Sequence, residues 1–301
     1  MSTQGSASAR TTICAVRVPA STSNLGAGFD CLGLALDLWL QASVKSGSGS
    51  PVYTGTLEHL SSEEDFLFGT IAGLLPTGTH LEVDSVIPVS RGLGSSAAAR
   101  VAGQVLKRLV TEAPVHRNEV YDRARVLEGH PDNAGPAVYG GLVLAAARPT
   151  VLRLHDTLGV ALAIPAQPIS TEQARSILPP QIPREQAIEQ ASRAAALLLG
   201  LTRGYPELIW HGMSDVIATP YRAPLIVGYA DAVDAGEKAG AYGVAISGAG
   251  SGIVAITEKH LSSQVADAMA TALTRSGNPA EGAAPEVVEG GFRVTERGSG
   301  R

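Results

Sequence analysis

The chain has 301 residues, which is enough for two lobes of about 150 residues each or for one large domain. Hydrophobic residues make up 45% of it and charged residues 17%, a balance typical of a globular protein with a sizeable core. The formal net charge of -5 offers no overall attraction for a polyphosphate and argues against a dedicated nucleic-acid-binding protein.

Residues 1–11 are rich in Ser, Ala and Thr and predict a disordered leader. They lack the apolar segment of a signal peptide, and no later apolar run is long enough for a transmembrane helix. Cys14 and Cys31 are too few for a disulfide framework and are expected to be reduced. Together these features predict a cytoplasmic protein that does not contact a membrane.

The first part of the chain, residues 12–158, predicts a lobe that mixes strands with a helix. Alternating apolar residues indicate the strands, and apolar residues at helical spacing indicate the helix. Pro19 is expected to end the first strand, because proline cannot donate to a sheet, and a polar, glycine-rich loop is expected over residues 20–30. The expected elements are strands over 12–18, 32–40, 81–89 and 140–144 and a helix over 96–110.

From residue 159 the pattern begins again and predicts a second lobe over residues 159–296. Its strands are short and apolar, and two of them flank a glycine turn. The expected elements are strands over 160–164, 244–247 and 253–256, helices near 188–198 and 261–273, and a loop over 276–291.

The segment Gly92-Leu93-Gly94-Ser95-Ser96 directly precedes an expected helix. Glycines let backbone N–H groups approach an anion closely, serine can cap a first helical turn, and a helix N-terminus favours phosphate. The segment is not a P-loop, because Gly-Lys-Ser/Thr is missing, nor the dinucleotide fingerprint, because Ala97 stands where the third glycine would fall. Taken alone, it is explained equally well by a plain glycine turn capped by serine.

A polar cluster, Glu128-Gly129-His130-Pro131-Asp132-Asn133, precedes an apolar, glycine-rich stretch. Glu128 is suited to hold Mg²⁺, because this ion takes few carboxylates together with phosphates. His130, Asp132 and Asn133 could orient a polar substrate. The alternative is a surface turn, since Pro-Asp-Asn is a typical turn sequence.

Two further glycine-containing segments lie between apolar strands. Asn24 and Asp30 flank two glycines. Taken alone, the segment that contains them is also explained by a connecting loop with Asx turns. Ser247-Gly-Ala-Gly-Ser-Gly252 fits either a phosphate loop or a glycine hairpin that packs against another backbone.

These segments resemble motifs of the GHMP kinase superfamily and, within it, of the homoserine kinases. Pro19–Gly33 resembles the first motif of the superfamily, Gly92–Ala98 its ATP loop, and Ser247–Gly252 its C-terminal glycine motif. Glu128–Asn133 is more specific, being similar to the homoserine-kinase stretch Gly-His-Pro-Asp-Asn, and residues 169–179 and 213–222 strengthen the resemblance. It covers nearly the whole chain. It implies a two-lobe α+β fold with an N-terminal lobe like ribosomal protein S5 and a ferredoxin-like C-terminal lobe.

The resemblance also implies transfer of the ATP γ-phosphoryl group to the side-chain hydroxyl of L-homoserine, in threonine biosynthesis, with Mg²⁺ as the metal. It places Ser96 and Glu128 near the metal, and these two with Asn133 form the expected catalytic group. The residues that it implies for ATP are Pro88, Val89, Ser90, Arg91, Gly92, Leu93, Gly94, Ser95, Ser96, Ala97 and Ala98. Those that it implies for the amino-acid pocket are Asn24, Asp30, His130, Asp132, Asn133, Thr171, Arg175 and Arg222.

The side-chain types agree with these roles. The carboxylate of an amino acid suits the guanidinium forks of Arg175 and Arg222, and its ammonium suits the carboxylates of Asp30 and Asp132. Phosphoryl transfer depends mainly on positioning and charge neutralisation, so a strong base is not obligatory. We therefore expect Asp30 to bind the substrate rather than to remove its proton.

Two alternatives remain open from the sequence. The first is another GHMP kinase, acting on mevalonate, shikimate or a related alcohol. The second is a non-catalytic RNA-binding module, which the acidic charge and the lack of an interleaved basic and aromatic patch oppose. The sequence leaves the oligomeric state open, a homodimer included.

Overall fold

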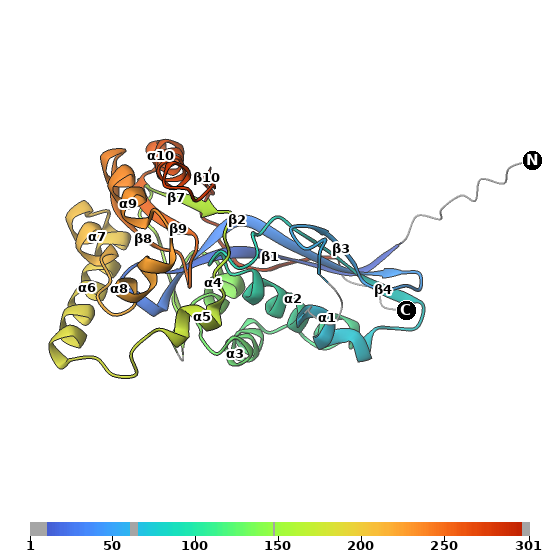
Figure 1. Cartoon of the computed structure of the whole chain (residues 1–301). Helices are drawn as coiled ribbons and strands as arrows, with labels where there is room; N and C mark the ends of the chain where they lie inside the picture. Colours follow the sequence, from blue (N-terminus) through green and yellow to red (C-terminus); the bar gives the residue numbers. More distant parts are fainter. Residues whose placement is uncertain (1–10, 61–65, 147, 297–301) are drawn as a thin grey trace, which may run out of the picture.

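The structure is a computed structural model that describes residues 11–60, 66–146 and 148–296. The leader expected over residues 1–11 therefore lies, apart from Thr11, outside the described residues. Two sheets, each with helices packed against it, form two lobes, and the expected two-lobe α+β architecture is confirmed (Figure 1). Within the described ranges, no helix is both long enough and apolar enough to cross a membrane.

The first lobe is built on a sheet with the strand order β11-β1-β2-β4-β3, to which β5 and β6 are added beside β2. All of its pairings are antiparallel except that of β3 with β4. Helices α1, α2 and α3 lie along one side of this sheet (Figure 1). The strands are β1 (Thr12–Asn24), β2 (Gly28–Ser46), β3 (Val52–Gly55), β4 (Thr79–Ser85), β5 (Leu142–Leu144), β6 (Thr150–Leu152) and β11 (Arg293–Glu296). The helices are α1 (Phe66–Ile71), the 3-10 turn η1 (Ala72–Leu74), α2 (Ser95–Val110), α3 (Arg117–Glu128) and α4 (Ala134–Tyr139).

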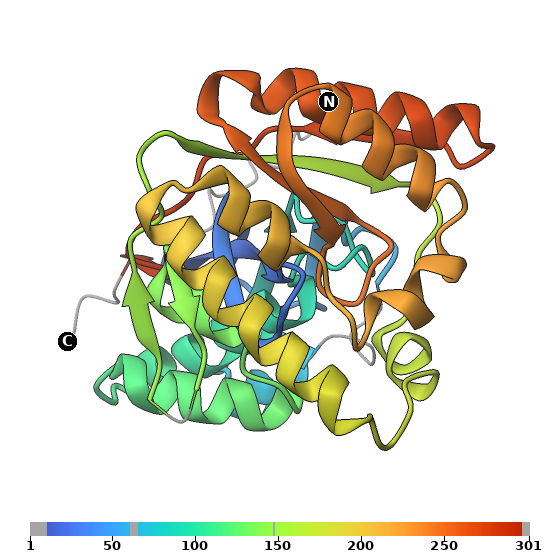
Figure 2. The same cartoon turned by 90° about the vertical axis from the view of Figure 1, so that its left-hand side faces the viewer.

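The second lobe has a four-stranded antiparallel sheet in the order β10-β7-β9-β8. In Figure 2, α10 and α9 lie along one side of these strands, and α6 crosses the molecule on the other. The strands are β7 (Leu158–Pro165), β8 (Ala241–Ile246), β9 (Ile253–Glu258) and β10 (Ala280–Ala283). The helices are α5 (Thr171–Ser176), α6 (Arg184–Arg203), α7 (Pro206–Met213), α8 (Thr219–Arg222), α9 (Tyr229–Lys238) and α10 (Ser262–Arg275), with 3-10 turns η2 (Ala223–Leu225) and η3 (Lys259–Leu261).

The alternation of side chains along β7 and β9 joins the two lobes. Val160 and Val254 point to one face and belong to a core that continues into the first lobe. Ala161 and Ala255 point to the other face and pack with residues of α9 and α10. Because successive side chains of a strand face opposite sides, one sheet serves two cores.

The first strand is longer than its sequence predicts. The prediction that Pro19 ends it is wrong, because β1 continues to Asn24 and is paired with β2 throughout. The pairing shifts register between Pro19 and Ala20, so that a bulge accommodates the missing N–H donor. The loop expected over residues 20–30 is therefore only a tight turn, Leu25–Ala27, and the second half of β1 brings Asn24 to the region between the lobes.

Three other expectations need correction. The strand expected over 81–89 ends at Ser85, which frees the following residues for a loop. The stretch 276–291 is not all loop, because it contains β10 at the edge of the second sheet. The last strand, β11, pairs with β1, so the final residues of the range assigned to the second lobe, 159–296, return to the first sheet.

Candidate active site

The glycine-rich segment forms the turn that leads into α2. Gly92 and Gly94 both have positive φ, at 68° and 69°. A Cβ on Gly92 would lie 1.8 Å from the carbonyl oxygen of Ser247, and one on Gly94 would lie 2.2 Å from the hydroxyl oxygen of Ser21. Only glycine fits these two positions, because both the backbone conformation and the space exclude a side chain.

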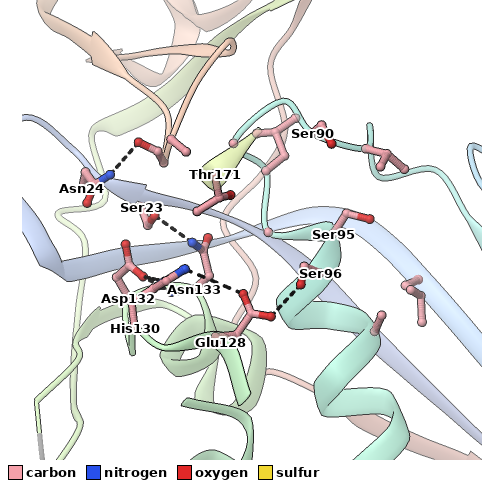
Figure 3. Close-up of a pocket in the computed structure, with 18 of the residues that line it drawn as sticks. Ser23, Asn24, Ser90, Ser95, Ser96, Glu128, His130, Asp132, Asn133 and Thr171 are labelled. Carbon is pink, nitrogen blue, oxygen red and sulfur yellow. Dashed lines mark hydrogen bonds and ion pairs between the residues drawn. The ribbon is translucent and has the colours of Figure 1, made fainter. Parts of the chain in front are cut away.

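Gly94 occupies the N-cap of α2, so Ser95 and Ser96 are its first two helical residues. The expectation that one of these serines caps the helix is therefore wrong. The first N–H groups of a helix have no acceptor within it, and the helix dipole adds partial positive charge. This end of α2 is suited to bind a phosphate, and the side chain of Ser95 lines the cavity in front of it (Figure 3).

Glu128 stands beside this helix end, at the last position of α3. Its side chain is 6% exposed. The hydroxyl of Ser96 donates to Glu128 Oε1 at 2.6 Å, and Arg100 Nε contacts the same oxygen at 2.5 Å. The second oxygen, Oε2, lies 3.9 Å from His130 Nε2. One carboxylate oxygen is therefore held by α2, and the pair Ser96–Glu128 expected from the sequence is brought together (Figure 3).

His130 and Asp132 form a close pair next to Glu128, with His130 Nδ1 2.6 Å from Asp132 Oδ1. Burial alone lowers the pKa of His130, but the hydrogen bond and charge of Asp132 outweigh it and raise this pKa. Burial raises the pKa of Asp132, but the hydrogen bond and charge of His130 outweigh it and lower this pKa. Each side chain of the pair therefore favours the charged form of the other.

Asn133 connects the start of α4 to β1. Its Oδ1 accepts from the hydroxyl of Ser21 at 2.8 Å, and its Nδ2 donates to the hydroxyl oxygen of Ser23 at 2.9 Å. All three side chains are buried. The amide is thus fixed in one orientation by two hydroxyls that come from a different part of the chain.

A charged group formed by Asn24, Asp30, Arg175 and Arg222 lies at the other end of the site. Asn24 donates to the carbonyl of Gly248 at 2.6 Å, and its Oδ1 accepts from the backbone N–H of Asp30 at 2.9 Å. The guanidinium of Arg175 makes two hydrogen bonds to the Asp30 carboxylate, at 2.6 and 3.2 Å. The two side chains expected to bind opposite ends of an amino acid are thus paired with each other.

Arg222 is 3% exposed, which is unusual for arginine. Its Nε donates to the carbonyl of Ala174 at 2.9 Å and its NH1 group to that of Gly248 at 3.2 Å. The guanidinium also lies 5.1 Å from the centre of the Phe29 ring. Burial lowers the pKa of Arg222, and the charge of Arg175 lowers it further. Both acceptors are neutral carbonyls, so the guanidinium retains its charge for an anion.

One cavity unites these groups. The volume of this cavity, including the solvent-filled opening, is about 1100 Å³. Polar and charged residues line one end, and apolar side chains line the other, where the first sheet faces α2. The lining residues are Ser23, Asn24, Asp30, Leu40, Leu57, Leu60, Val83, Val89, Ser90, Gly92, Leu93, Gly94, Ser95, Ser96, Ala99, Glu128, His130, Asp132, Asn133, Thr171, Arg175, Arg222, Gly248 and Ala249.

Four residues expected to contact ATP lie elsewhere among the described residues. Ala97 and Ala98 are fully buried in the core beneath α2. Pro88 and Arg91 line a separate hollow beside β7, where Arg91 Nε donates to the carbonyl of Pro165 at 3.1 Å. Arg91 therefore fastens the glycine loop to the second lobe instead of pointing at the cavity.

The segment Ser247–Gly252 packs against the glycine loop. Ser247 Oγ donates to the carbonyl of Gly92 at 2.7 Å, and the N–H of Gly252 donates to the carbonyl of Arg91 at 3.2 Å. The hairpin alternative is thus supported by direct backbone contact, while Gly248 and Ala249 still reach the cavity wall.

Comparison with known proteins decides the family. The model of the GHMP kinases N terminal domain matches residues 54–141, and the model named GHMP kinases C terminal matches residues 208–275. A homoserine kinase of Picosynechococcus sp. is 39% identical over 280 residues, which cover 85% of this chain and 91% of that protein. The chain belongs to the homoserine kinase family of GHMP kinases.

Solved structures agree with this membership. The crystal structure of homoserine kinase from Cytophaga hutchinsonii matches with a TM-score of 0.82 and 29% identity, over 95% of this chain and 98% of that one. The mevalonate kinase of Methanococcus jannaschii matches with a TM-score of 0.65 over 95% of this chain and 100% of that one, but at 12% identity, so that it supports the fold alone. The GHMP kinase fold expected from the motifs is confirmed.

Sequence reasoning missed part of this homoserine kinase site. The apolar end of the cavity includes Val83 of β4 with Leu57 and Leu60 from the turn after β3, and none of the three carries a motif. Ser21 and Ser23 fix the Asn133 amide although the first motif pointed only to Asn24 and Asp30 as ligands. Their position on alternate residues of a strand that ends at the site is the signal that could have identified them.

The residues present fit a magnesium ion. Mg²⁺ is usually bound by one or two carboxylates together with substrate phosphates and water. Glu128 supplies a nearly buried carboxylate with one oxygen held by Ser96 and Arg100, and it adjoins the helix end suited to phosphate. Among residues 11–60, 66–146 and 148–296, no group of three or more His, Cys, Asp and Glu side chains is arranged to hold a metal.

Proposed function

We propose that this chain transfers the γ-phosphoryl group of ATP to the side-chain hydroxyl of L-homoserine and so acts in threonine biosynthesis, in the cytoplasm. The observation that carries the proposal is that one cavity joins a helix end suited to phosphate to the charged group of Asn24, Asp30, Arg175 and Arg222. The first feature suits the phosphates of a nucleotide, and the second suits the two charges of an amino acid. The homoserine kinase relatives support the choice of acceptor.

The nucleotide occupies the cavity from its apolar end to α2. Leu57, Leu60 and Val83 offer a surface for the base, and the glycine loop with Ser95 and Ser96 holds the phosphates. The wall of the cavity also includes three other residues of the expected ATP group, Val89, Ser90 and Leu93. With the nucleotide in this orientation, its γ-phosphate lies near Glu128 and the start of α2.

Ser96 and Glu128 would hold Mg²⁺, which when bound neutralises charge on the β- and γ-phosphates. Arg100 and the Ser96 hydroxyl fix Oε1 of Glu128 and thereby orient the carboxylate. The carboxylate is thus oriented before the nucleotide binds, so that little reorganisation is needed at this end of the site.

The acceptor lies between the phosphates and the arginines. Its carboxylate binds Arg222 and Arg175, and its ammonium binds Asp30 with the side-chain oxygen of Asn24 nearby. Thr171, at the first turn of α5, lines the same end of the cavity. Binding requires Arg175 to exchange the Asp30 carboxylate for that of the substrate, which leaves Asp30 for the ammonium.

The chain contributes to the reaction chiefly by positioning its substrates. The acceptor oxygen forms a bond to the γ-phosphorus while the bond from phosphorus to the bridging oxygen of ADP breaks, and the hydroxyl proton leaves to the transferred phosphate or to solvent. Both carboxylates nearest the acceptor are engaged in the bound state, Asp132 by His130 and Asp30 by the ammonium of the acceptor. Asn133 and His130 form the wall beside the acceptor hydroxyl and hold it in line with the phosphate.

A coupled ADP-release assay with L-homoserine, L-serine, L-threonine and mevalonate as acceptors tests the proposal. Homoserine is expected to be turned over with the highest kcat/KM, because the charged end of the cavity recognises both charges of an amino acid. Glu128→Gln is expected to lose most of this activity, whereas Glu185→Gln, which changes an exposed side chain of α6, retains it. Wild-type protein that does not phosphorylate homoserine would overturn the proposal, and preference for mevalonate would replace it with the other GHMP kinase activity.

A further inference from the structure

Asp215 is a buried carboxylate that does not line the cavity. It lies in the turn between α7 and α8 and is 7% exposed. Its Oδ1 accepts from the N–H of Ile217 at 3.1 Å, and its Oδ2 accepts from the N–H of Ala218 at 2.8 Å and from that of Thr219. A side chain that accepts these three consecutive N–H groups fixes the path of the chain into α8.

The same carboxylate also accepts from a side chain of α6. Gln190 Nε2 donates to Asp215 Oδ1 at 2.8 Å and also lies 3.1 Å from the carbonyl oxygen of Ala27. Gln190 Oε1 in turn accepts from the N–H of Val216 at 3.1 Å. Gln190 is 8% exposed, and its Nε2 joins the turn before α8 to the turn between β1 and β2, while its Oε1 holds the first of these turns a second time.

These two turns carry both halves of the acceptor pocket. Ala27 lies between Asn24 and Asp30, and its N–H donates to the carbonyl of Gly212 at 2.9 Å. Arg222 ends α8, and its N–H donates at 3.0 Å to the carbonyl of Ala218, whose own N–H is held by Asp215. Figure 1 shows α8 and α6 at the end of the first lobe where the β1–β2 turn reaches.

Arg222 and Asn24, at the end of β1, also share an acceptor at Gly248, which lies in the loop between β8 and β9. The carbonyl of Gly248 accepts from Asn24 at 2.6 Å and from Arg222 at 3.2 Å. Since one carbonyl serves both side chains, a small shift of α8 would move the guanidinium away from the ammonium-binding side of the pocket. The Asp215–Gln190 pair is the connection that opposes such a shift from outside the cavity.

We propose that Asp215 and Gln190 are positioning residues that hold Arg222 at a fixed distance from the Asn24–Asp30 turn and so give the enzyme its preference for an acceptor with a carboxylate. This inference rests on the proposed function, since it concerns how the same pocket selects its acceptor. Neither residue touches the substrate. Both act through Arg222 and through the backbone of the β1–β2 turn.

The test compares the wild type with Asp215→Ala, Asp215→Asn and Gln190→Ala in steady-state kinetics. Two acceptors are used, L-homoserine and 3-amino-1-propanol, which is homoserine without its carboxylate. Displacement of a binding group by about 1 Å can cost on the order of 100-fold. We therefore expect Asp215→Ala and Gln190→Ala to raise KM for homoserine by roughly 10- to 100-fold, with KM for ATP changed less than about threefold.

Three further readouts separate positioning from general destabilisation. Turnover of 3-amino-1-propanol is expected to be unchanged within about threefold, because this acceptor does not use Arg222. Asp215→Asn keeps one oxygen that can accept from the start of α8 and is expected to recover most of the affinity lost in Asp215→Ala. Asn278→Ala removes a buried amide that donates to the carbonyl of Val227 in the second lobe, and it should lower stability without changing KM for homoserine.

Each result has one meaning. A rise of KM for homoserine alone, with recovery by Asp215→Asn, supports the inference. The inference fails, and the proposed function stands, if the wild-type enzyme phosphorylates homoserine but the variants show no rise in KM for homoserine. It also fails if KM for homoserine and KM for ATP rise by the same factor in the variants. Gln190→Ala provides this answer even where Asp215→Ala does not fold. Wild-type protein without homoserine turnover overturns the proposed function and this inference together.

Discussion

The hydrogen bonds of Asn133 allow a quantitative prediction for Asn133→Ala. This substitution removes the partner of Ser21 and of Ser23, both of which are fully buried. A buried polar group left without its partner costs about 1–3 kcal/mol. Ser21 retains only a weak contact, at 3.5 Å, with the backbone carbonyl of Asn133, and Ser23 retains the Asp132 carboxylate as an acceptor. We therefore expect a loss near the middle of the range for one group, about 2 kcal/mol, rather than twice that amount.

Urea denaturation and thermal melting measure this loss. For a chain of 301 residues, with an unfolding entropy of about 2.1 cal/mol/K per residue, 2 kcal/mol corresponds to a fall in Tm of about 3 °C. Because Asn133 lines the cavity beside the acceptor, kcat for homoserine is also expected to fall by roughly tenfold or more at a temperature well below the melting transition. The two effects share one cause, since the same hydroxyls that stabilise the fold also orient the amide.

Asn118→Ala is the matched control. The exposed side chain of Asn118 accepts a hydrogen bond from the hydroxyl of Tyr139 at 2.7 Å, and its removal is expected to change stability by less than about 0.5 kcal/mol. An Asn133→Ala variant that unfolds at the same urea concentration as the wild type would refute the reasoning. So would equal losses for the two variants, because burial would then have no influence on the cost.

Three further predictions concern substrate binding, the glycine loop and pH. Asp30→Asn is expected to raise KM for homoserine about tenfold or more, because the substrate ammonium loses the carboxylate that binds it. A fall in kcat by several orders of magnitude at unchanged KM would show instead that Asp30 acts as a base. Gly92→Ala should raise KM for ATP at least about tenfold and lower the free energy of unfolding by about 1–3 kcal/mol, because its Cβ would lie 1.8 Å from the carbonyl oxygen of Ser247. An unchanged KM for ATP and an unchanged Tm would contradict this. The hydrogen bond from Lys45 lowers the pKa of Glu82 below 4.5, so the carboxylate stabilises the fold above that pH and ceases to do so as the pH falls through the lowered value. Urea titrations should therefore show that the free energy of unfolding of the wild type exceeds that of Glu82→Gln by about 1 kcal/mol or less at pH 7. This difference should shrink as the pH falls below 4.5. A difference that stays constant as the pH is lowered would disprove the assignment.

Local sequence signals predicted the strongly periodic elements well. The helix expected over 96–110 is α2, and the helix expected near 261–273 is α10, because each has a regular apolar face. Helix α3 was not predicted, since half of its residues are charged and only three, Val120, Tyr121 and Ala124, are buried. Its helical state depends on packing against α2, which no local pattern expresses.

The sequence by itself determined the chemistry that this protein has available. Gly92 and Gly94 could be recognised because positive φ and close packing restrict the residue type that a position accepts. Ser96 and Glu128 could be singled out because their oxygens are of the kind that Mg²⁺ prefers. What each side chain faces was decided only by the tertiary structure. Arg91 points away from the cavity although it stands inside the glycine loop, whereas apolar residues without a motif complete the opposite wall.

The same distinction holds for the acceptor end. The sequence supplied Asp30, Arg175 and Arg222 as charges that suit an amino acid, but they are separated by up to 192 positions along the chain (222 minus 30). Only the fold pairs Arg175 with Asp30 and buries Arg222 against the carbonyl of Gly248. Ionic contacts depend on distance and on exclusion of water, and both of these are properties of the packed lobes rather than of any segment.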